Sequence, residues 1–376
     1  MTCLYIHIPF CLSKCPYCSF VSYPNMESLY ARYGAALVRE AEGLRREFPD
    51  MEPLSTLFLG GGTPTILSGQ ELAKIVVSCH KVFGFAPEAE ITTEANPQTL
   101  DQEKLALLRQ SGINRLSLGV QSLNDQELQS LGRPHSAGDA VTALRLARAV
   151  GFTNISLDLM YGIPGQDRHS WQNSLEQALS LAPDHLSLYE LTVEAGTPYH
   201  VRLDSGQLDL PDEDELAAMD QLTATLCRQA GLIQYEISNY ARPEFECRHN
   251  INYWRNGSYP ALGAGAVACM AGCRQQKVRD PLRYCELIES GQSVVGEEEC
   301  LEPAASFRES VIMGLRMVKG VSRARLLQRY GLDVESFYGE TLVRLMDQGL
   351  VEMSVGHLRL TERGRVFANQ VMAELV

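Results

Sequence analysis

Short apolar runs alternate with longer amphipathic stretches through the first two thirds of the chain. Six runs have the length and composition of buried strands, at residues 4–8, 56–59, 90–93, 115–120, 155–160 and 185–191. Apolar residues recur at helical spacing between them, over 29–48, 71–82, 105–111, 140–150 and 171–181. This alternation predicts an α/β fold with parallel strands and right-handed crossovers. The periodicity does not separate a barrel from an open doubly wound sheet.

The pattern changes after about residue 240. The segment 241–300 is rich in glycine, cysteine and aromatic residues and shows no clear strand–helix unit. Helical periodicity then covers 307–318, 322–330 and 334–348. Two strand-like runs follow at 350–354 and 357–360, and a last helix is expected from about Arg363. We therefore predict three parts: a first domain at 1–240, a connecting segment at 241–302 and a winged-helix-like α+β domain at 303–376.

Composition narrows the classes of protein that fit. The 46 acidic and 33 basic residues give a formal net charge of −13, which argues against nucleic acid as the main partner. No run approaches the roughly 18 consecutive apolar residues of a membrane-spanning helix. The chain is therefore expected to be a cytoplasmic globular protein.

Three cysteines, Cys11, Cys15 and Cys18, follow the first predicted strand in the run HIPFCLSKCPYCSF. Three thiolates on one loop can bind three irons of a [4Fe–4S] cluster, whereas clusters that only carry electrons usually have four cysteine ligands. The fourth iron would then be free to bind a small molecule. A structural zinc ion needs four ligands and normally a second CxxC pair, and a disulfide scaffold suits small secreted proteins. The pattern favours the iron–sulfur site, and the other cysteines are expected to be mostly small core residues.

The motif CxxxCxxC near an N-terminal strand resembles the signature of the radical S-adenosylmethionine (SAM) superfamily. The longer run LYIHIPFCLSKCPYCSF resembles the branch that contains oxygen-independent coproporphyrinogen III oxidase and related haem chaperones. The resemblance extends over nearly the whole chain. It implies a partial (β/α)6 barrel, with a [4Fe–4S] cluster on the three cysteines and SAM on the fourth iron. In such a barrel the site lies at the C-terminal ends of the strands, where this cysteine loop is expected.

Further positions match those that this branch uses around SAM. Glycines in the run LGGGTPT let the backbone approach a ligand, and free N–H groups of such a loop can meet its polar groups. Glu94 ends the third predicted strand, where a carboxylate can accept hydrogen bonds from ribose hydroxyls. Arg133 is expected on the helical stretch after the fourth strand. The full set of matching positions is Tyr5, Tyr17, Gly61, Gly62, Thr63, Glu94, Gln121, Arg133 and Asp158.

Two features set the chain apart from the oxidases of the branch. Phe20 stands where the oxidases carry a further cysteine, and residues 249–254 read HNINYW. The motif HNxxYW resembles that of the haem chaperones, which implies His249 as an axial haem ligand and Tyr253 and Trp254 as contacts of the macrocycle. Cys247 is a further candidate for a thiolate. The alternative for His249 is a hydrogen-bonded structural residue.

The resemblance implies a haem chaperone that binds haem as cargo and passes it to haem-requiring proteins, such as those of the respiratory chain at the membrane. Oxidative decarboxylation of coproporphyrinogen III is the alternative, and Phe20 counts against it. A radical SAM enzyme for an unrelated small molecule is a third interpretation, because one barrel hosts many chemistries. The sequence leaves open whether the protein is an enzyme, which residues would be catalytic, which protein accepts the haem and whether a homodimer forms.

Overall fold

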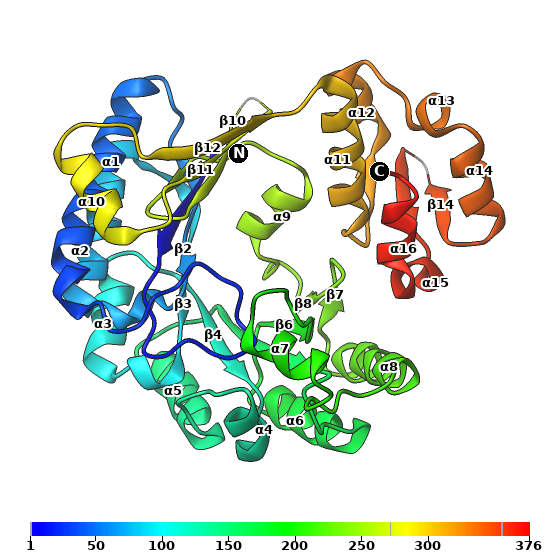
Figure 1. Ribbon diagram of the computed structural model, residues 1–376, viewed down its shortest axis with the longest axis horizontal. Coiled ribbons are helices and arrows are strands. Elements are labelled where there is room, and N and C mark those ends of the chain that lie inside the picture. The colour runs from blue at the N-terminus through cyan, green and yellow to red at the C-terminus, as the bar shows by residue number, and fades with distance from the viewer. Residues whose placement is uncertain (1, 271, 355) are drawn as a thin grey trace.

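A nine-stranded sheet, curved into an open barrel, forms the body of the protein (Figure 1). The computed structural model describes residues 2–270, 272–354 and 356–376. The six predicted strands are β1 (Cys3–Ile8), β2 (Leu54–Gly61), β3 (Phe85–Ala95), β4 (Arg115–Gln121), β5 (Ile155–Tyr161) and β6 (His185–Glu190). Each pairs in parallel with the next one along the chain. The predicted partial (β/α)6 barrel is confirmed.

Helices cover the outer face of this sheet (Figure 1). They are α1 (Tyr30–Glu47), α2 (Gly69–Phe83), α3 (Gln102–Gln110), α4 (Asp125–Ser130), α5 (Ala137–Ala149), α6 (Arg168–Ser180) and α8 (Glu213–Gln229), whereas the short α7 (Pro198–Asp204) lies against the cysteine loop, where Tyr199 N–H donates to the Pro16 carbonyl oxygen. Helix α2 shows why they form where they do. Ser68 and Glu71 make a capping box at its start, and Leu72, Ile75 and Val76 bury one face at helical spacing.

The two faces of the barrel wall differ in chemistry. The outward-facing residues of β1, including Leu4, Ile6 and Ile8, belong to the main hydrophobic core under the helices. Alternate strand residues form the other face, and this inner face is polar although it is buried. Its members include Thr56, Glu90, Arg115, Ser156 and His185. The interior of the barrel therefore depends on hydrogen bonds and charge compensation rather than on apolar packing.

The expectation that residues 241–300 hold no strand–helix unit is wrong. After β7 (Ile233–Gln234) and the antiparallel β8 (Asn239–Ala241), helix α9 (Arg248–Trp254) leads to β9 (Ala261–Leu262), which pairs in parallel with β1. A two-residue strand and a seven-residue helix are too short to give a periodic signal. Helix α9 lies inside the curve of the sheet (Figure 1).

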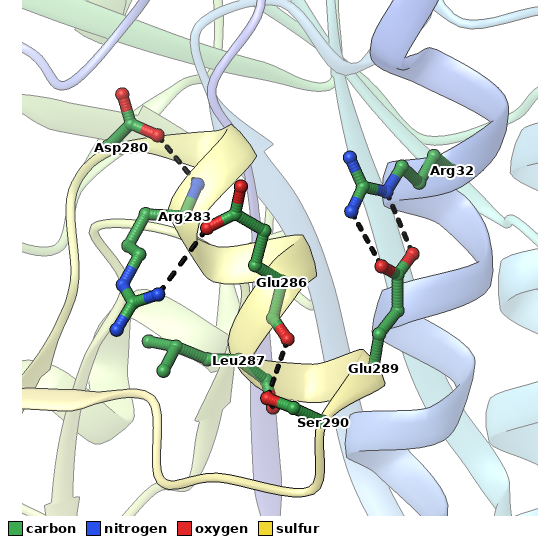
Figure 2. A network of polar contacts seen from close by, with 7 residues as sticks. All are labelled: Arg32, Asp280, Arg283, Glu286, Leu287, Glu289 and Ser290. Carbon is green, nitrogen blue, oxygen red and sulfur yellow. Dashed lines mark hydrogen bonds and ion pairs between the residues drawn. The ribbon is translucent and has the colours of Figure 1, made fainter.

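A small second sheet lies beyond β9. Its strands are β10 (Val267–Met270), β11 (Cys273–Lys277) and β12 (Val295–Cys300), with α10 (Pro281–Glu289) between the last two. Figure 2 shows α10 beside α1, where Arg32 donates two hydrogen bonds to the Glu289 carboxylate at 2.8 and 2.5 Å. A buried contact also links these elements, because the Glu40 carboxylate of α1 accepts from Lys277 and from the Tyr284 hydroxyl.

The C-terminal unit has the expected winged-helix-like outline. It contains α11 (Pro303–Leu315), β13 (Val321–Ser322), α12 (Arg323–Tyr330), α13 (Val334–Tyr338), α14 (Glu340–Asp347), β14 (Val351–Ser354), β15 (His357–Leu360), α15 (Glu362–Val366) and α16 (Ala368–Ala373). The single helix predicted over 334–348 is wrong, because Gly339 at φ 48° separates α13 from α14. The exact boundaries at residues 240 and 302 stay a prediction. None of the helices in the described ranges is long and apolar enough to cross a membrane.

The cysteines outside the N-terminal motif follow the prediction with one exception. Six of them are buried: Cys3, Cys79, Cys227, Cys247, Cys269 and Cys285. Cys273 and Cys300 instead form a disulfide, because β11 and β12 place them directly opposite each other.

Candidate cofactor site and the neighbouring helix α9

A cavity of ≈430 Å³ lies at the C-terminal ends of the parallel strands. This is the place where parallel barrels build their sites, and the volume lies within the range of small-molecule pockets. Its lining includes all three motif cysteines and every predicted SAM residue except one. The predicted residues that line it are Cys11, Cys15, Cys18, Tyr17, Gly61, Gly62, Thr63, Glu94, Gln121, Arg133 and Asp158.

The cysteine loop follows β1 and is held at several points. Cys11 Sγ lies 3.8 Å from the Thr63 hydroxyl, and Arg133 Nη1 lies 3.6 Å from Cys15 Sγ. Burial raises the pKa of the Cys11 and Cys18 thiols, so their thiolates need nearby positive charge. Bound iron would supply that charge, and the Arg133 guanidinium adds to it.

The donor set suits a cluster better than a single ion. Across residues 2–270, 272–354 and 356–376, no three His, Cys, Asp or Glu side chains converge closely enough to hold one metal ion. A [4Fe–4S] cluster takes one thiolate on each of several irons, so its ligands stand further apart than those of a tetrahedral zinc ion. Cys11, Cys15 and Cys18 would hold the cluster.

Glycines let the loop after β2 approach the cysteine loop. A Cβ on Gly62 would lie 2.5 Å from the Phe10 carbonyl oxygen and 2.8 Å from Cys11 Sγ. Gly61 has a φ of +120°, a conformation that L side chains rarely adopt. Any side chain at Gly62 would therefore displace the loop that carries the cysteines.

Two partly buried carboxyl groups belong to the lining of the cavity. Glu94 accepts a hydrogen bond from Gly61 N–H at 3.1 Å, and burial, followed by the nearby Asp158, raises its pKa to about 8. Asp158 accepts from the hydroxyls of Ser117 at 3.0 Å and Ser156 at 3.2 Å, and burial also raises its pKa. Groups of this kind bind ligand donors such as ribose hydroxyls or an ammonium group.

The remaining residues of the set lie near the fourth strand. Gln121 ends β4 with a positive φ of 68°, unusual for a residue other than glycine. The placement of Arg133 on a helix is wrong, because it lies in the loop between α4 and α5. Gly132 at φ +64° ends the preceding turn, and Pro134 follows. From this loop, Arg133 Nη2 donates to the Gly119 carbonyl oxygen at 2.9 Å.

Tyr5 is the predicted SAM residue that does not line the cavity. Its hydroxyl lies 2.9 Å from His7 Nδ1, and His7 Nε2 lies 2.8 Å from the Val21 carbonyl oxygen. A carbonyl only accepts, so His7 carries its proton on Nε2 and accepts from Tyr5. The Tyr5 hydroxyl therefore orients His7, whose hydrogen bond to Val21 holds the end of the cysteine loop.

Several lining residues were missed by the sequence analysis. They are polar or aromatic side chains at the wall and rim, such as Ser22, Asn96, Ser117, Tyr189, Thr192 and Glu194. Ser117 could have been predicted from strand periodicity. It lies on the predicted fourth strand four residues before Gln121, so the two residues are expected on the same face. The loop residues carry no such signal. Phe20 lies at the cavity with 65% of its surface exposed.

The motif residue His249 lies on α9, away from the cavity lining. Its side chain is fully buried, with Nδ1 2.7 Å from the Thr56 hydroxyl and Nε2 2.9 Å from the Tyr253 hydroxyl. Burial, with a smaller effect of Arg115, lowers the pKa of His249 to about 3. Both ring nitrogens of His249 have hydrogen-bond partners, as expected if it is a structural residue rather than a haem ligand in this conformation. Haem ligation by His249 stays a prediction, and it needs α9 to move.

The other motif side chains are also engaged. The Tyr253 ring meets the His249 ring edge-on, and the Arg316 guanidinium lies 4.5 Å from the Trp254 ring centre. Cys247 is fully buried, with Sγ 3.7 Å from a Glu90 carboxylate oxygen, and burial raises its pKa to about 12. It is a protonated thiol in this conformation, which does not match the suggested thiolate ligand.

Comparison with known proteins bears on both halves of the chain. Residues 5–178 match the Radical SAM superfamily, and residues 301–367 match the HemN C-terminal domain. The heme chaperone HemW of Bacillus subtilis is 36% identical over 374 residues, covering 99% of this chain and 98% of that protein. HemW of Escherichia coli is 33% identical over 377 residues, covering 98% and 96%. The chain belongs to the HemW family.

A solved structure supports the architecture of this HemW family member. Coproporphyrinogen III oxidase (HemN) from Escherichia coli superimposes with a TM-score of 0.85 at 24% identity, covering 100% of this chain and 90% of that one. This likeness confirms the predicted fold class, and the full-length relatives confirm the predicted family. Membership of the radical SAM superfamily implies a [4Fe–4S] cluster and SAM, and the cysteine loop, glycine loop and carboxyl groups described above fit both.

Proposed function

We propose that the protein is a haem chaperone, which binds haem and delivers it to haem-requiring proteins with the help of a [4Fe–4S] cluster and SAM. The observation that carries this proposal is the full-length kinship with proteins named heme chaperone HemW. Two local features support it. Phe20 replaces the cysteine expected in the oxidases, and the HNxxYW motif is complete at residues 249–254.

The chain's own residues divide the work at the cavity. Cys11, Cys15 and Cys18 would bind three irons, and the glycine loop would bring its backbone N–H groups against SAM. Glu94 and Asp158 would accept hydrogen bonds from its polar groups. A bound and reduced cluster would supply the one electron that cleaves SAM to methionine and a deoxyadenosyl radical, while the side chains of the cavity position SAM and exclude water.

Haem binding is tested by titrating hemin into anaerobically reconstituted protein while following its Soret band. We expect saturable binding to the wild type and weaker binding to the His249→Ala variant. The exposed His169 on α6 offers a matched control, and His169→Ala should bind hemin like the wild type. Wild-type protein that binds hemin no better than an unrelated control protein would refute the chaperone proposal.

A second candidate function is oxidative decarboxylation of coproporphyrinogen III. The observation that favours it is the complete SAM cavity on a fold shared with HemN. An anaerobic assay with dithionite, SAM and substrate decides the matter. Formation of protoporphyrinogen would favour the oxidase function over the chaperone function. If protein with a full cluster forms no protoporphyrinogen, the oxidase function is excluded.

We further propose a cytoplasmic location, acceptors among respiratory haem proteins at the membrane, and His249 as one axial ligand. Thiols that bind a cluster stay reduced in the cytoplasm, which supports the location. Transfer is measured by mixing haem-loaded protein with vesicles that contain an apo-cytochrome and following the acceptor spectrum. Sedimentation of the reconstituted protein, with and without hemin, tests whether a homodimer forms.

A further inference from the structure

Helix α9 is clamped at both ends. At its start, the Glu90 carboxylate accepts from Arg248 N–H at 3.0 Å and from His249 N–H at 3.1 Å. At its end, Asn256 donates to Glu309 and Ser310 of α11 at 3.0 Å each. The helix that carries the HNxxYW motif is therefore held between the barrel interior and the C-terminal unit. A change at either clamp alters how firmly His249 is buried.

A continuous chain of hydrogen bonds runs from the cavity to the start of α9. Ser156 Oγ donates to Asp158 at 3.2 Å and lies 2.8 Å from His185 Nδ1. His185 Nε2 lies 2.8 Å from the Tyr235 hydroxyl. That hydroxyl accepts from Cys247 N–H, the capping position of α9, at 3.2 Å. Asp158 lines the SAM cavity, so the chain joins the two places.

The proton positions along this chain follow from its acidic end. Since Ser156 gives its only proton to Asp158, its oxygen accepts from His185 Nδ1–H. His185 is fully buried and burial lowers its pKa well below the usual value, so the ring is neutral and Nε2 accepts from Tyr235. Every donor then points toward Asp158, and aligned hydrogen bonds of this kind polarise and strengthen one another.

We propose that His185 and Tyr235 are positioning residues that couple occupancy of the SAM cavity to the release of helix α9. A ligand hydroxyl or ammonium group that donates to Asp158 competes with Ser156 for the carboxylate. The hydrogen bonds behind Ser156 weaken, and Tyr235 holds Cys247 N–H less firmly. SAM thereby loosens α9 and frees His249 for haem. This inference rests on the proposed function, because it gives SAM the role of opening the haem-binding helix.

The first test is hydrogen exchange of the backbone amides of residues 247–255 in reconstituted protein without haem. We expect SAM to accelerate their exchange at least about fivefold, the lower end of typical couplings between two sites. In Tyr235→Phe the exchange should already be fast without SAM, and adding SAM should leave its rate nearly unchanged. Tyr240→Phe is the matched control, because that buried tyrosine of β8 lies outside the hydrogen-bond chain. An unchanged exchange rate in wild-type protein saturated with SAM would overturn the inference.

The second test is the hemin dissociation constant with and without SAM. SAM should tighten hemin binding to the wild type and to Tyr240→Phe several-fold, and should leave Tyr235→Phe unaffected. Direct SAM binding by equilibrium dialysis should be retained in all three proteins. Ser156→Ala, which interrupts the chain next to Asp158, should behave like Tyr235→Phe and replaces it if that variant does not fold. The inference is contradicted if SAM tightens hemin binding in Tyr235→Phe or Ser156→Ala as much as in the wild type. If SAM accelerates amide exchange in the wild type but the wild type binds no hemin, only the chaperone proposal is contradicted.

Discussion

Gly62 is the residue whose lack of a side chain most directly shapes the site. In Gly62→Ala the new Cβ would overlap the Phe10 carbonyl oxygen and Cys11 Sγ, both on or beside the cysteine loop. We expect the reconstituted variant to hold less than about half of the wild-type iron and sulfide, because the loop must shift away. Gly34→Ala is the control, since a Cβ there meets nothing within 4 Å. Full iron content in Gly62→Ala would show that the loops do not need this close approach.

Glu94 makes the stability of the cofactor-free protein depend on pH. Its carboxyl pKa is raised to about 8 in the folded state, chiefly by burial, so between its ordinary value of 4.5 and 8 the folded protein binds more protons than the unfolded one. The free energy of unfolding should therefore fall as pH rises through this window, by at most about 1.4 kcal/mol per pH unit. Urea unfolding at several pH values measures this slope. Glu94→Gln should flatten it, and an equally steep slope in that variant would rule Glu94 out as the cause.

At the level of single residues, the sequence predicted which side chains gather but not how each is held. The order of motifs after successive strands was enough to place Glu94 and Asp158 at the cavity. It did not reveal that Tyr5 turns toward His7, or that both nitrogens of His249 already have partners. Those contacts depend on side-chain orientation and on residues distant in the chain, about which a motif carries no information.

Helix α9 depends on a buried carboxylate outside the helix for the hydrogen bonds at its start. Glu90 satisfies two N–H groups at its start, which no residue within the short helix can do. Glu90→Gln keeps one acceptor and loses the charge, so we expect the free energy of unfolding to fall by about 1.5–3 kcal/mol. Chemical denaturation measures the loss. Glu88→Gln, an exposed change on the same strand, should leave the midpoint nearly unchanged, and equal effects of the two changes would contradict this role of Glu90.

Among the elements, long periodic segments were predicted well and short ones were not. The six parallel strands and their helices carry clear periodicity. The two-residue β9 and the break at Gly339 do not, because tertiary pairing and a single backbone conformation decide them. The cross-strand disulfide was missed for the same reason, since it depends on the register of β11 and β12.

For the whole molecule, the buried pair of Glu40 and Lys277 ties the small sheet to the barrel. Lys277→Met leaves the Glu40 carboxylate buried without its cation, and we expect the free energy of unfolding to fall by about 3–5 kcal/mol. Unfolding in guanidinium measures the change. The exposed pair of Arg32 and Glu289 joins the same two regions (Figure 2), and Glu289→Gln should scarcely move the midpoint. A Lys277→Met protein as stable as the wild type would show that this contact adds nothing.

The pairing of β9 with β1 has a consequence for synthesis. Tyr5 N–H donates to the Pro260 carbonyl oxygen at 3.1 Å, so the first strand of the chain gains its second neighbour only after most of the protein has left the ribosome. Until then one edge of β1 is unpaired, and other chains can pair with it and aggregate. This edge lies immediately before the three cysteines. Stalled or truncated products should therefore be prone to aggregation and to thiol damage together.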